Sequence, residues 1–282
     1  MKTDLPESQL TRRHEIEAVL DRIGAGEDSA IDLADAALQL AAFDQPELKL
    51  DPYRRHLAAL VRDVAAKNAA ENCAARAAAL NAVFVERWGY TGDSANYDDV
   101  ANASLARVID RRKGLPVALG ILYIHTARAL GWDMSGLNFP GHFLVRLEGE
   151  RMILDPFNGG QTLSAGDLRR LLKVAEGNDA ELAPEHYESV SNRDILLRLQ
   201  NNLRMRLFRS GDVRRAADIT RSMLRIAPDE TALWREAGVL YAELGEIQPA
   251  ISALEQFLDS SGSDSERHQA AALLQSLRTR LT

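Results

Sequence analysis

The sequence predicts an α+β domain followed by an all-α region of helical repeats. Apolar residues recur at three- and four-residue steps through residues 8–88, as is typical of helices. Residues 143–155 alternate between apolar and polar or form short apolar blocks, which indicates two short strands. From about residue 193 the chain resembles itself after a shift of 34 residues, which indicates stacked pairs of helices.

Composition and charge limit the classes of function. The 282 residues are 46% hydrophobic, which suits one large domain or two modest ones. The net charge of -7, with charges of mixed sign, provides no broad basic surface, so no nucleic-acid partner is expected. The first 20 residues lack a signal-peptide core and no run of eighteen apolar residues occurs, so we expect no membrane segment and a cytoplasmic location. The single cysteine, Cys73, excludes an internal disulfide and a cysteine-rich zinc site.

The first 131 residues are predicted to be helices joined by loops. An alanine-rich helix over 65–88 places Cys73 on its apolar face, where it is expected to be buried. Pro116 suits a first helical turn, and Gly131 suits a helix end. The expected elements are helices across 8–88 with breaks near Gly24–Gly26 and Gln45–Pro46, a loop over 89–104, a helix over 103–112 and an apolar helix ending before Gly131.

The two strands carry a histidine and an aspartate. If Glu148 and Gly149 form a two-residue turn, the register places His142 directly opposite Asp155. Such pairs have Cβ atoms about 4.5–5.5 Å apart. An aspartate at that distance can hold the imidazole by a hydrogen bond and fix its tautomer. The sequence therefore permits a His142–Asp155 dyad.

A nucleophile for this dyad is missing from its expected position. A helix followed by strands that carry His and then Asp is the chain order of papain-like and transglutaminase-like folds, where a cysteine begins the helix. Here the helix begins Gly114-Leu115-Pro116, so proline occupies the cysteine position, and no Ser or Thr stands between Gly114 and His125. Cys73 lies far upstream. Acyl-enzyme catalysis is therefore not expected.

The C-terminal region repeats with a period of 34 residues. The shift pairs Gly211 with Gly245, and Trp234 and Tyr241 stand at the spacings of the tetratricopeptide pattern. Pro228 closes the first unit. Residues 265–281 supply a single helix, as expected for a terminal cap. The sequence therefore predicts two tetratricopeptide repeats and a capping helix.

Three sequence runs carry a family resemblance. They are NYDDVANASLARVIDRRKGLPVALGILYIHTARALGW, LNFPGHFLVRL and ILDPFNGG. They resemble the SirB-type family of bacterial proteins, which joins a transglutaminase-like domain to tetratricopeptide repeats and usually has proline at the cysteine position. The resemblance implies a transglutaminase-like domain over residues 1–190 and repeats over 191–282, and it supplies no activity. The family motif is matched at Asn102, Ser104, Asp110, Arg112, Gly114, Pro116, Pro140, Gly141, His142, Phe143, Asp155, Pro156, Gly159 and Gly160.

His142 and Asp155 have three alternative interpretations. They form a structural hydrogen-bonded pair, a cleft that contacts a ligand or partner, or a catalytic pair acting on bound water. A metal site that adds Asp110 would lack the clustered imidazole or thiolate spacing of zinc sites, so no metal and no cofactor are expected. No catalytic residue is assigned, and the candidate binding residues are Asn102, Asp110, Arg112, Asn138, His142 and Asp155.

The sequence favours a pseudo-enzyme that binds another molecule. We expect a non-catalytic transglutaminase-like and tetratricopeptide protein that acts as a protein- or peptide-binding module or regulatory scaffold, with a partner whose identity the sequence leaves open. The alternative is a hydrolase or acyltransferase in which His142 and Asp155 work with a non-standard or partner-supplied nucleophile.

Overall fold

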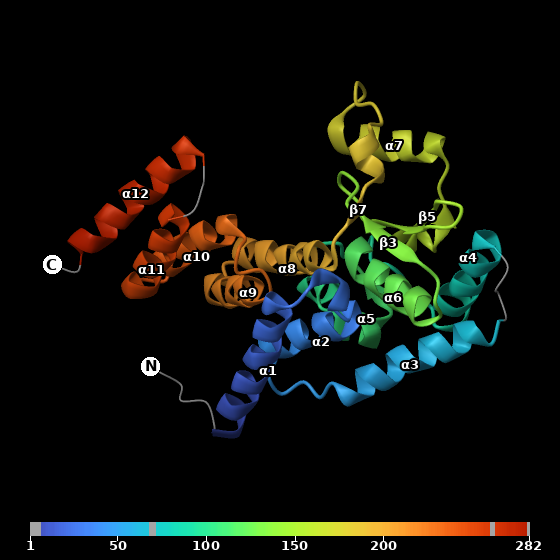
Figure 1. Ribbon diagram of the computed structural model, residues 1–282, viewed down its shortest axis with the longest axis horizontal. Coiled ribbons are helices and arrows are strands. Elements are labelled where there is room, and N and C mark those ends of the chain that lie inside the picture. The colour runs from blue at the N-terminus through green and yellow to red at the C-terminus, as the bar shows by residue number, and fades with distance from the viewer. Residues whose placement is uncertain (1–6, 68–71, 260–262, 281–282) are drawn as a thin grey trace. The chain divides into compact units, whose positions relative to one another are not determined.

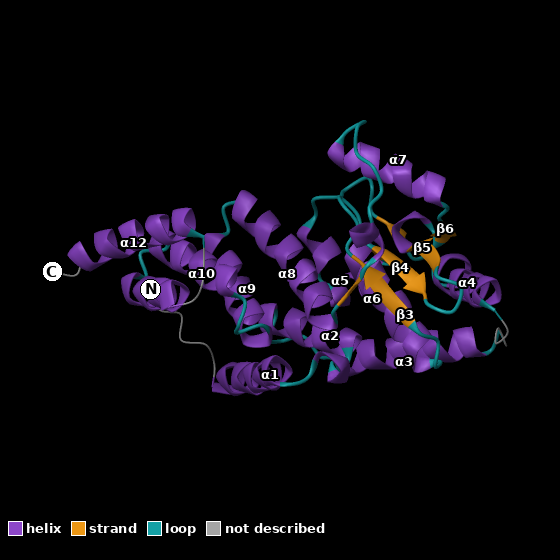
Figure 2. Cartoon of the chain, turned by 45° about the horizontal axis from the view of Figure 1, so that its top comes forward, coloured by secondary structure: helices purple, strands orange, loops and turns teal. Residues whose placement is uncertain are grey.

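The computed structural model describes residues 7–67, 72–259 and 263–280 and confirms the predicted fold class, with many helices and a small antiparallel sheet (Figures 1 and 2). The helices are α1 (Glu7–Ala25), α2 (Leu33–Asp44), α3 (Asp51–Ala65), α4 (Cys73–Asn81), α5 (Leu105–Arg111), α6 (Pro116–Ala129), α7 (Ala165–Glu176), α8 (Asn192–Arg209), α9 (Val213–Ile226), α10 (Thr231–Glu243), α11 (Ile247–Asp259) and α12 (Asp264–Thr279). The strands are β1 (Thr91–Gly92), β2 (Lys113–Gly114), β3 (Met134–Leu137), β4 (Leu144–Leu147), β5 (Met152–Asp155), β6 (Gln161–Thr162) and β7 (Ser189–Val190).

The chain divides into two compact units. The described residues of 28–41 and 48–199 form one unit, called here the sheet unit. The described residues of 1–27, 42–47 and 200–282 form the other, called the repeat unit. Helices α2 and α8 each contribute residues to both.

The sheet unit is built on five strands in the order β6-β5-β4-β3-β7. All neighbouring strands in this sheet are antiparallel. A short parallel pair, β1 with β2, lies apart from it. Every residue of β4 is buried, so this strand is covered on both faces of the sheet.

Helices cover both faces of the sheet. On one face α6 approaches so closely that a Cβ on Gly120 would lie 2.6 Å from the Phe143 ring. On the other face Leu144 and Ile153 pack with Leu168 and Leu172 of α7. Because consecutive strand side chains point to opposite faces, the apolar runs Phe143–Val145 and Ile153–Leu154 serve both layers. This packing fixes the strand ends that carry His142 and Asp155.

The predicted helix over 65–88 differs from the structure. Helix α3 ends at Ala65, and α4 begins at Cys73 after Asn72, whose side chain accepts a hydrogen bond from the Ala75 N–H. Residues 68–71 of the predicted helix lie outside the described residues. The helix continues past Asn81 as a π-helical turn over Ala82–Arg87. Alanine content alone did not reveal the N-cap at Asn72.

The C-terminal helices form the two predicted helical pairs, α8 with α9 and α10 with α11, followed by α12, and from residue 200 onward they belong to the repeat unit. Gly211 and Gly245 have φ of 83° and 73°, so the turn inside each pair uses a conformation that favours glycine. A Cβ on Gly238 would lie 2.7 Å from Leu254, which explains the need for a small residue where α10 meets α11. Residue 281 of the predicted capping helix lies outside the described residues.

Helix α1 groups with the repeats, whereas the predicted boundary places residues 1–190 together. It packs against α9, and a Cβ on Gly24 would lie 2.1 Å from the Arg225 carbonyl oxygen. Arg225 also forms ion pairs of 2.6 Å with Asp21 and 3.2 Å with Glu17. These contacts join the first helix to the C-terminal helices, and the spacing of its apolar residues alone cannot indicate them.

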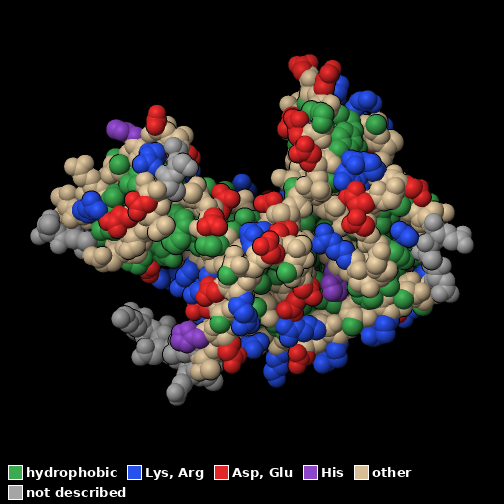
Figure 3. Space-filling model, viewed as in Figure 1, with side chains coloured by type: hydrophobic (Ala, Val, Ile, Leu, Met, Phe, Trp, Pro, Cys, Tyr) green, Lys and Arg blue, Asp and Glu red, His purple; other side chains and the backbone are tan. Residues whose placement is uncertain are grey.

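Charges of both signs are interspersed over the face shown in Figure 3. This distribution agrees with the mixed-sign composition of the sequence. Among the described helices, none combines the length and hydropathy that a membrane span requires.

Candidate functional site

Two turns place His142 and Asp155 at the same end of the sheet. Gly141, with φ of 66°, precedes His142, whose backbone N–H donates to the Phe139 carbonyl at 3.0 Å. Asp155 ends β5 and begins a 3₁₀ turn over Pro156–Asn158. Its side chain caps this turn, which fixes the carboxylate in one orientation.

The structure brings the two predicted side chains together. The Nε2 atom of His142 lies 2.9 Å from Oδ1 of Asp155. Asp155 is fully buried, and the His142 side chain is 13% exposed. The Asp155 carboxylate also accepts hydrogen bonds from the Phe157 and Asn158 backbone N–H groups, at 3.0 and 3.2 Å, and from the Asn158 side-chain amide at 2.7 Å. Asp155 therefore organises both the imidazole and the turn that follows it.

The predicted register of this hairpin was wrong by two residues. Leu147 pairs with Met152 and not with Glu150, so four residues, Glu148 to Arg151, connect the strands. Arg151 has φ of 52°, which the two-residue turn did not require. A shift of two residues keeps every side chain on its original face. The dyad therefore survives as a diagonal contact at the strand ends.

The protonation state of Asp155 determines the tautomer of His142. Burial raises the pKa of Asp155, but the hydrogen bonds from His142 and Asn158 outweigh burial and hold that pKa below its ordinary value. An ionised carboxylate only accepts hydrogen bonds, so Nε2 of His142 carries a proton. In the neutral imidazole the lone pair then lies on Nδ1, which is the state a general base requires.

Pro116 lies in the first turn of α6. This is the position where transglutaminase-like enzymes have a cysteine nucleophile and where the sequence predicts none. Pro116 follows Leu115, the N-cap residue, and is buried. Gly120 lies one turn further along the same helix face and abuts Phe143, the residue after His142. Pro116 therefore shares with Gly120 the face of α6 that packs on Phe143. Its ring supplies neither a nucleophilic atom nor a backbone N–H.

Cys73 lies at the opposite end of the hairpin from the dyad. Its Sγ is 3.6 Å from the position that a Cβ on Gly149 would occupy, and Gly149 lies in the turn between β4 and β5. The four residues of β4 alone span about 13 Å, and His142 lies beyond their other end. Cys73 is 2% exposed, as expected for a small buried apolar residue. The geometry keeps this thiol away from the imidazole.

The other predicted site residues lie in different environments. Asn102 is buried and accepts a hydrogen bond from Arg111 at 3.1 Å. Asp110 is largely exposed on α5 and accepts a hydrogen bond from the Tyr53 hydroxyl at 3.2 Å. Asn138 is exposed at the end of β3. These residues do not share the polar contacts of the His142–Asp155 pair.

Arg112 belongs to an aromatic cluster. Its guanidinium lies 5.1 Å from the ring centres of both Trp88 and Tyr90 and donates to the Tyr90 hydroxyl at 3.1 Å. The Tyr90 hydroxyl also lies 2.8 Å from Nε2 of His56. Burial, together with the positive charge of Arg112, lowers the pKa of His56 to about 4. Arg112 therefore fastens the end of α5 to the π-helical turn region.

The run Asp110–Lys113 suggested that an arginine pairs with a carboxylate, but the sequence assigned neither Arg111 nor Arg198 to the site, and both have structural roles near it. Arg111 donates to the buried carboxylate of Asp93 at 2.9 Å and forms an ion pair of 3.1 Å with Asp99, so it holds the 93–102 loop. Arg198 donates to the His142 carbonyl at 2.7 Å. It also lies 5.7 Å from the ring centre of Phe143. The run Arg111-Arg112 gave no signal for which arginine faces the loop.

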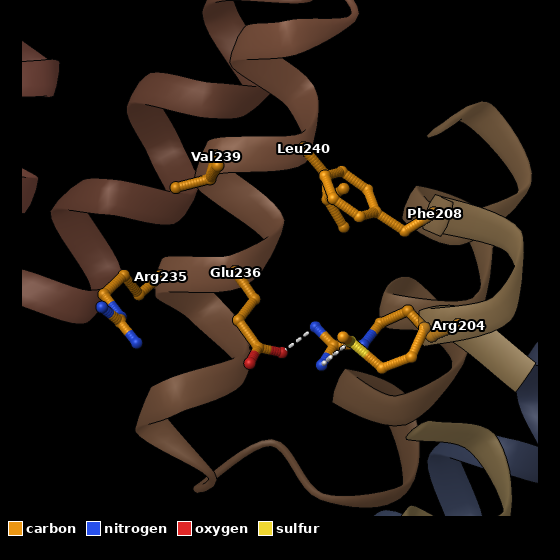
Figure 4. Close-up of a pocket in the computed structure, with 7 residues that line it drawn as sticks. Arg204, Phe208, Arg235, Glu236, Val239 and Leu240 are labelled. Atoms are coloured by element: carbon orange, nitrogen blue, oxygen red, sulfur yellow. Dashed lines mark hydrogen bonds and ion pairs between the residues drawn. The ribbon is translucent and has the colours of Figure 1, made fainter. Parts of the chain in front are cut away.

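A second candidate site is a groove in the repeat unit, between α8 and α10. It has a volume of about 280 Å³ and is lined by Arg204, Met205, Phe208, Arg235, Glu236, Val239 and Leu240 (Figure 4). Met205, Phe208 and Val239 are 36%, 42% and 47% exposed, although all three are large and apolar. Figure 4 shows Phe208 beside Leu240, with Glu236 directed toward Arg204. Apolar side chains left in water at a concave surface are typical of a binding site.

Fold and site together define a transglutaminase-like domain joined to helical repeats. Residues 51–201 match the transglutaminase-like superfamily, and residues 203–275 match the tetratricopeptide repeat. The chain is 34% identical to a UPF0162 protein of Vibrio cholerae over 83% of this chain and 88% of that one. It is 28% identical to Protein SirB1 of Salmonella typhimurium over 66% of this chain and 70% of that one. The chain therefore belongs to the SirB-type family of the transglutaminase-like superfamily. No solved structure gives a significant match.

The stabilising effect of Asp155 should depend on pH. Because its folded-state pKa lies below the unfolded value, ionised Asp155 stabilises the fold at neutral pH, and this stabilisation is lost as pH falls through the folded pKa. The difference in unfolding free energy between the natural chain and Asp155→Asn should be constant near pH 7 and shrink below about pH 4. Urea titrations from pH 3 to pH 7 measure it. A difference that grows on acidification contradicts the assigned direction of the pKa.

Proposed function

We propose that this protein is a non-catalytic binding module or regulatory scaffold that holds a protein or peptide in the groove between α8 and α10. Two observations support the proposal. Pro116 stands where the related enzyme fold needs a nucleophile, so His142 has no thiol or hydroxyl to activate at that position. The repeat unit presents Phe208 and Val239 to solvent at a concave surface.

The exposed apolar groove is the observation that carries the proposal. Each square ångström of apolar surface removed from water contributes about 25 cal/mol, so covering this groove favours association. The apolar side chains come from α8 and α10, which are the first helices of the two repeats. Met205 on α8 and Val239 on α10 are equivalent positions after the 34-residue shift. A partner segment that contacts both helices would bury side chains from both repeats at once.

The dyad has a structural role in this proposal. Asp155 receives hydrogen bonds from the backbone N–H groups of Phe157 and Asn158 in addition to the imidazole. These bonds satisfy the buried carboxylate of Asp155 and hold the turn after β5, so the pair is useful to the fold without any chemistry.

Substitutions in the groove and in the dyad should show which of these two sites binds the partner. Val239→Asp places a charge in the apolar groove and should reduce recovery of a bound partner at least about tenfold, because the partner's apolar side chains would meet a carboxylate. His142→Ala should leave recovery unchanged. The measurement is quantitative mass spectrometry of proteins that co-purify with the tagged full chain from its own cells.

The control for this experiment is the stability of the Val239→Asp variant. Val239 is 47% exposed, so the thermal unfolding midpoint of Val239→Asp should stay within a few degrees of the natural chain. Partner recovery that survives Val239→Asp but disappears with His142→Ala would move the binding site to the sheet unit and contradict the proposal.

The 2.9 Å contact between His142 and Asp155 favours a second candidate function. With Nε2 protonated, the Nδ1 lone pair of His142 could accept a proton from a bound hydroxyl or thiol. The protein would then be a hydrolase or acyltransferase whose nucleophile comes from a partner or is non-standard. Ester or thioester hydrolysis by the full chain that is lost with His142→Ala and retained with Val239→Asp would establish this candidate over the binding module.

A further inference from the structure

The lining of the groove between α8 and α10 contains more cationic than anionic side chains, although the whole chain has a net negative charge. Its lining contains the two guanidinium groups of Arg204 and Arg235 and the one carboxylate of Glu236. The charged lining therefore has an excess of one positive charge, whereas the whole chain carries -7. A segment that enters this groove meets apolar side chains together with a local cation.

The two arginines of the groove differ in how firmly they are held. Arg204 is 9% exposed, forms an ion pair with Glu236 and donates to the Asn201 side chain at 2.6 Å. Figure 4 shows this ion pair linking α8 to α10. Because the Arg204 guanidinium is buried and engaged on both sides, it ties the two helices together and is poorly placed to bind a ligand.

Arg235 is the more accessible cation. Its side chain is 31% exposed, and its Nη2 lies 3.3 Å from Oε1 of Glu266, a side chain that is 42% exposed. Ion pairs in such exposed positions are weak. A guanidinium has five N–H donors, so the partly exposed Arg235 side chain can donate to a second carboxylate while it keeps its ion pair with Glu266.

Glu266 does not depend on Arg235 for its position. The Ser263 hydroxyl donates to Oε2 of Glu266 at 2.7 Å, and the Glu266 backbone N–H donates back to that hydroxyl at 3.4 Å. These reciprocal bonds cap the start of α12. Arg235 is thus held near the groove by a carboxylate that has its own structural role.

We propose that the occupant of the groove is an acidic amphipathic peptide segment of a partner protein. Its apolar side chains cover Met205, Phe208 and Val239, and an aspartate or glutamate beside them pairs with Arg235. This inference rests on the proposed binding function and adds the chemical class of the partner. A basic segment would be repelled by the guanidinium of Arg235. A wholly polar segment would leave the apolar side chains of the groove exposed to water.

Selection from a random peptide library tests this class directly. Twelve-residue peptides displayed on phage are selected on the immobilised full chain, on Arg235→Gln and on Val239→Asp. The natural chain should enrich peptides that combine at least two large apolar residues with Asp or Glu. Arg235→Gln should retain the apolar enrichment and lose the acidic enrichment. Val239→Asp should enrich neither.

A synthetic peptide from the selection provides the quantitative measurement. Replacing its acidic residue by the corresponding amide should weaken binding to the natural chain about five- to tenfold and have no effect on binding to Arg235→Gln. Glu266→Gln, which removes the competing charge and keeps the capping geometry, should strengthen binding of the acidic peptide. Calorimetric titration measures all these affinities.

The outcomes distinguish this inference from the function on which it rests. If peptides selected on the natural chain lack acidic residues, or if Arg235→Gln keeps the acidic preference, the proposed partner class is wrong and the groove still binds peptides. If the natural chain enriches no peptides beyond those retained by Val239→Asp, the binding function of the groove is wrong as well.

Discussion

Asp155→Ala is expected to lower the free energy of unfolding by about 3–5 kcal/mol. The substitution removes a buried carboxylate and leaves three kinds of donor without an acceptor: the His142 imidazole, two backbone N–H groups and the Asn158 amide. A buried donor that loses its partner costs about 1–3 kcal/mol, whereas the amide of the exposed Asn158 can bond to water instead, so the loss arises mainly from the imidazole and the backbone groups beside the buried carboxylate. Urea unfolding followed by circular dichroism measures the loss.

Asp110→Ala is the matched control for this prediction. Asp110 is also an aspartate in the family motif, but its side chain is 42% exposed and its ion pair with Arg107 is long, at 3.6 Å. Its removal should change the unfolding free energy by less than about 1 kcal/mol. Equal losses of unfolding free energy for both aspartates would show that Asp155 does not hold the turn over Pro156–Asn158.

Gly160→Ala is expected to destabilise the protein by about 3 kcal/mol or more. Gly160 has φ of 70°, and a Cβ there would lie 1.9 Å from Oδ1 of Asn81 and 2.7 Å from the Tyr123 hydroxyl. Asn81 cannot easily move, because it donates to the Gly160 carbonyl at 2.9 Å and accepts from Tyr123 at 3.1 Å. The cost therefore combines backbone strain with overpacking of a held side chain.

The preceding glycine separates these two costs. Gly159 has the same φ of 70°, but no atom lies within 4 Å of the position of its Cβ. Gly159→Ala should thus carry the backbone cost alone, about 1–2 kcal/mol. The difference between the two variants in chemical denaturation isolates the overpacking. If Gly159→Ala is as damaging as Gly160→Ala, the contact with Asn81 is not the cause.

The strands show how far the sequence determined the site. Their period-two pattern predicted a hairpin that brings His142 near Asp155, and the structure confirms their contact at 2.9 Å. The predicted register was wrong because the pattern reports the face of each residue and is unchanged by a two-residue shift. Turn chemistry around Glu148–Gly149 did not reveal that Arg151 takes a left-handed conformation.

Long-range contacts account for most of what the sequence could not predict. Nothing near Arg111 in the chain shows that it pairs with Asp93 on the 93–102 loop, whereas Arg112 turns to Trp88 and Tyr90. Likewise, the apolar spacing of α1 indicates a helix but not its contact with α9. Side-chain partners of charged residues depend on tertiary packing, which local periodicity does not encode.

The groove could have been predicted in part. Met205 and Val239 are equivalent under the 34-residue shift and are both apolar at positions outside the core-forming set of the repeat. Repetition of an exposed apolar position is a usable signal for a binding surface. The charges could not be predicted in this way, because Arg204 aligns with Gly238 and its partner Glu236 has no charged equivalent at Asn202.

Hydrogen–deuterium exchange of the full chain, with and without its co-purified partner, tests the central claim most directly. The claim is that the protein acts through the groove between α8 and α10 and not through the His142–Asp155 pair. Binding should slow exchange in residues 201–209 and 232–241 and leave residues 138–160 unchanged. Protection confined to residues 138–160, with the groove exchanging as in the free protein, would contradict the claim.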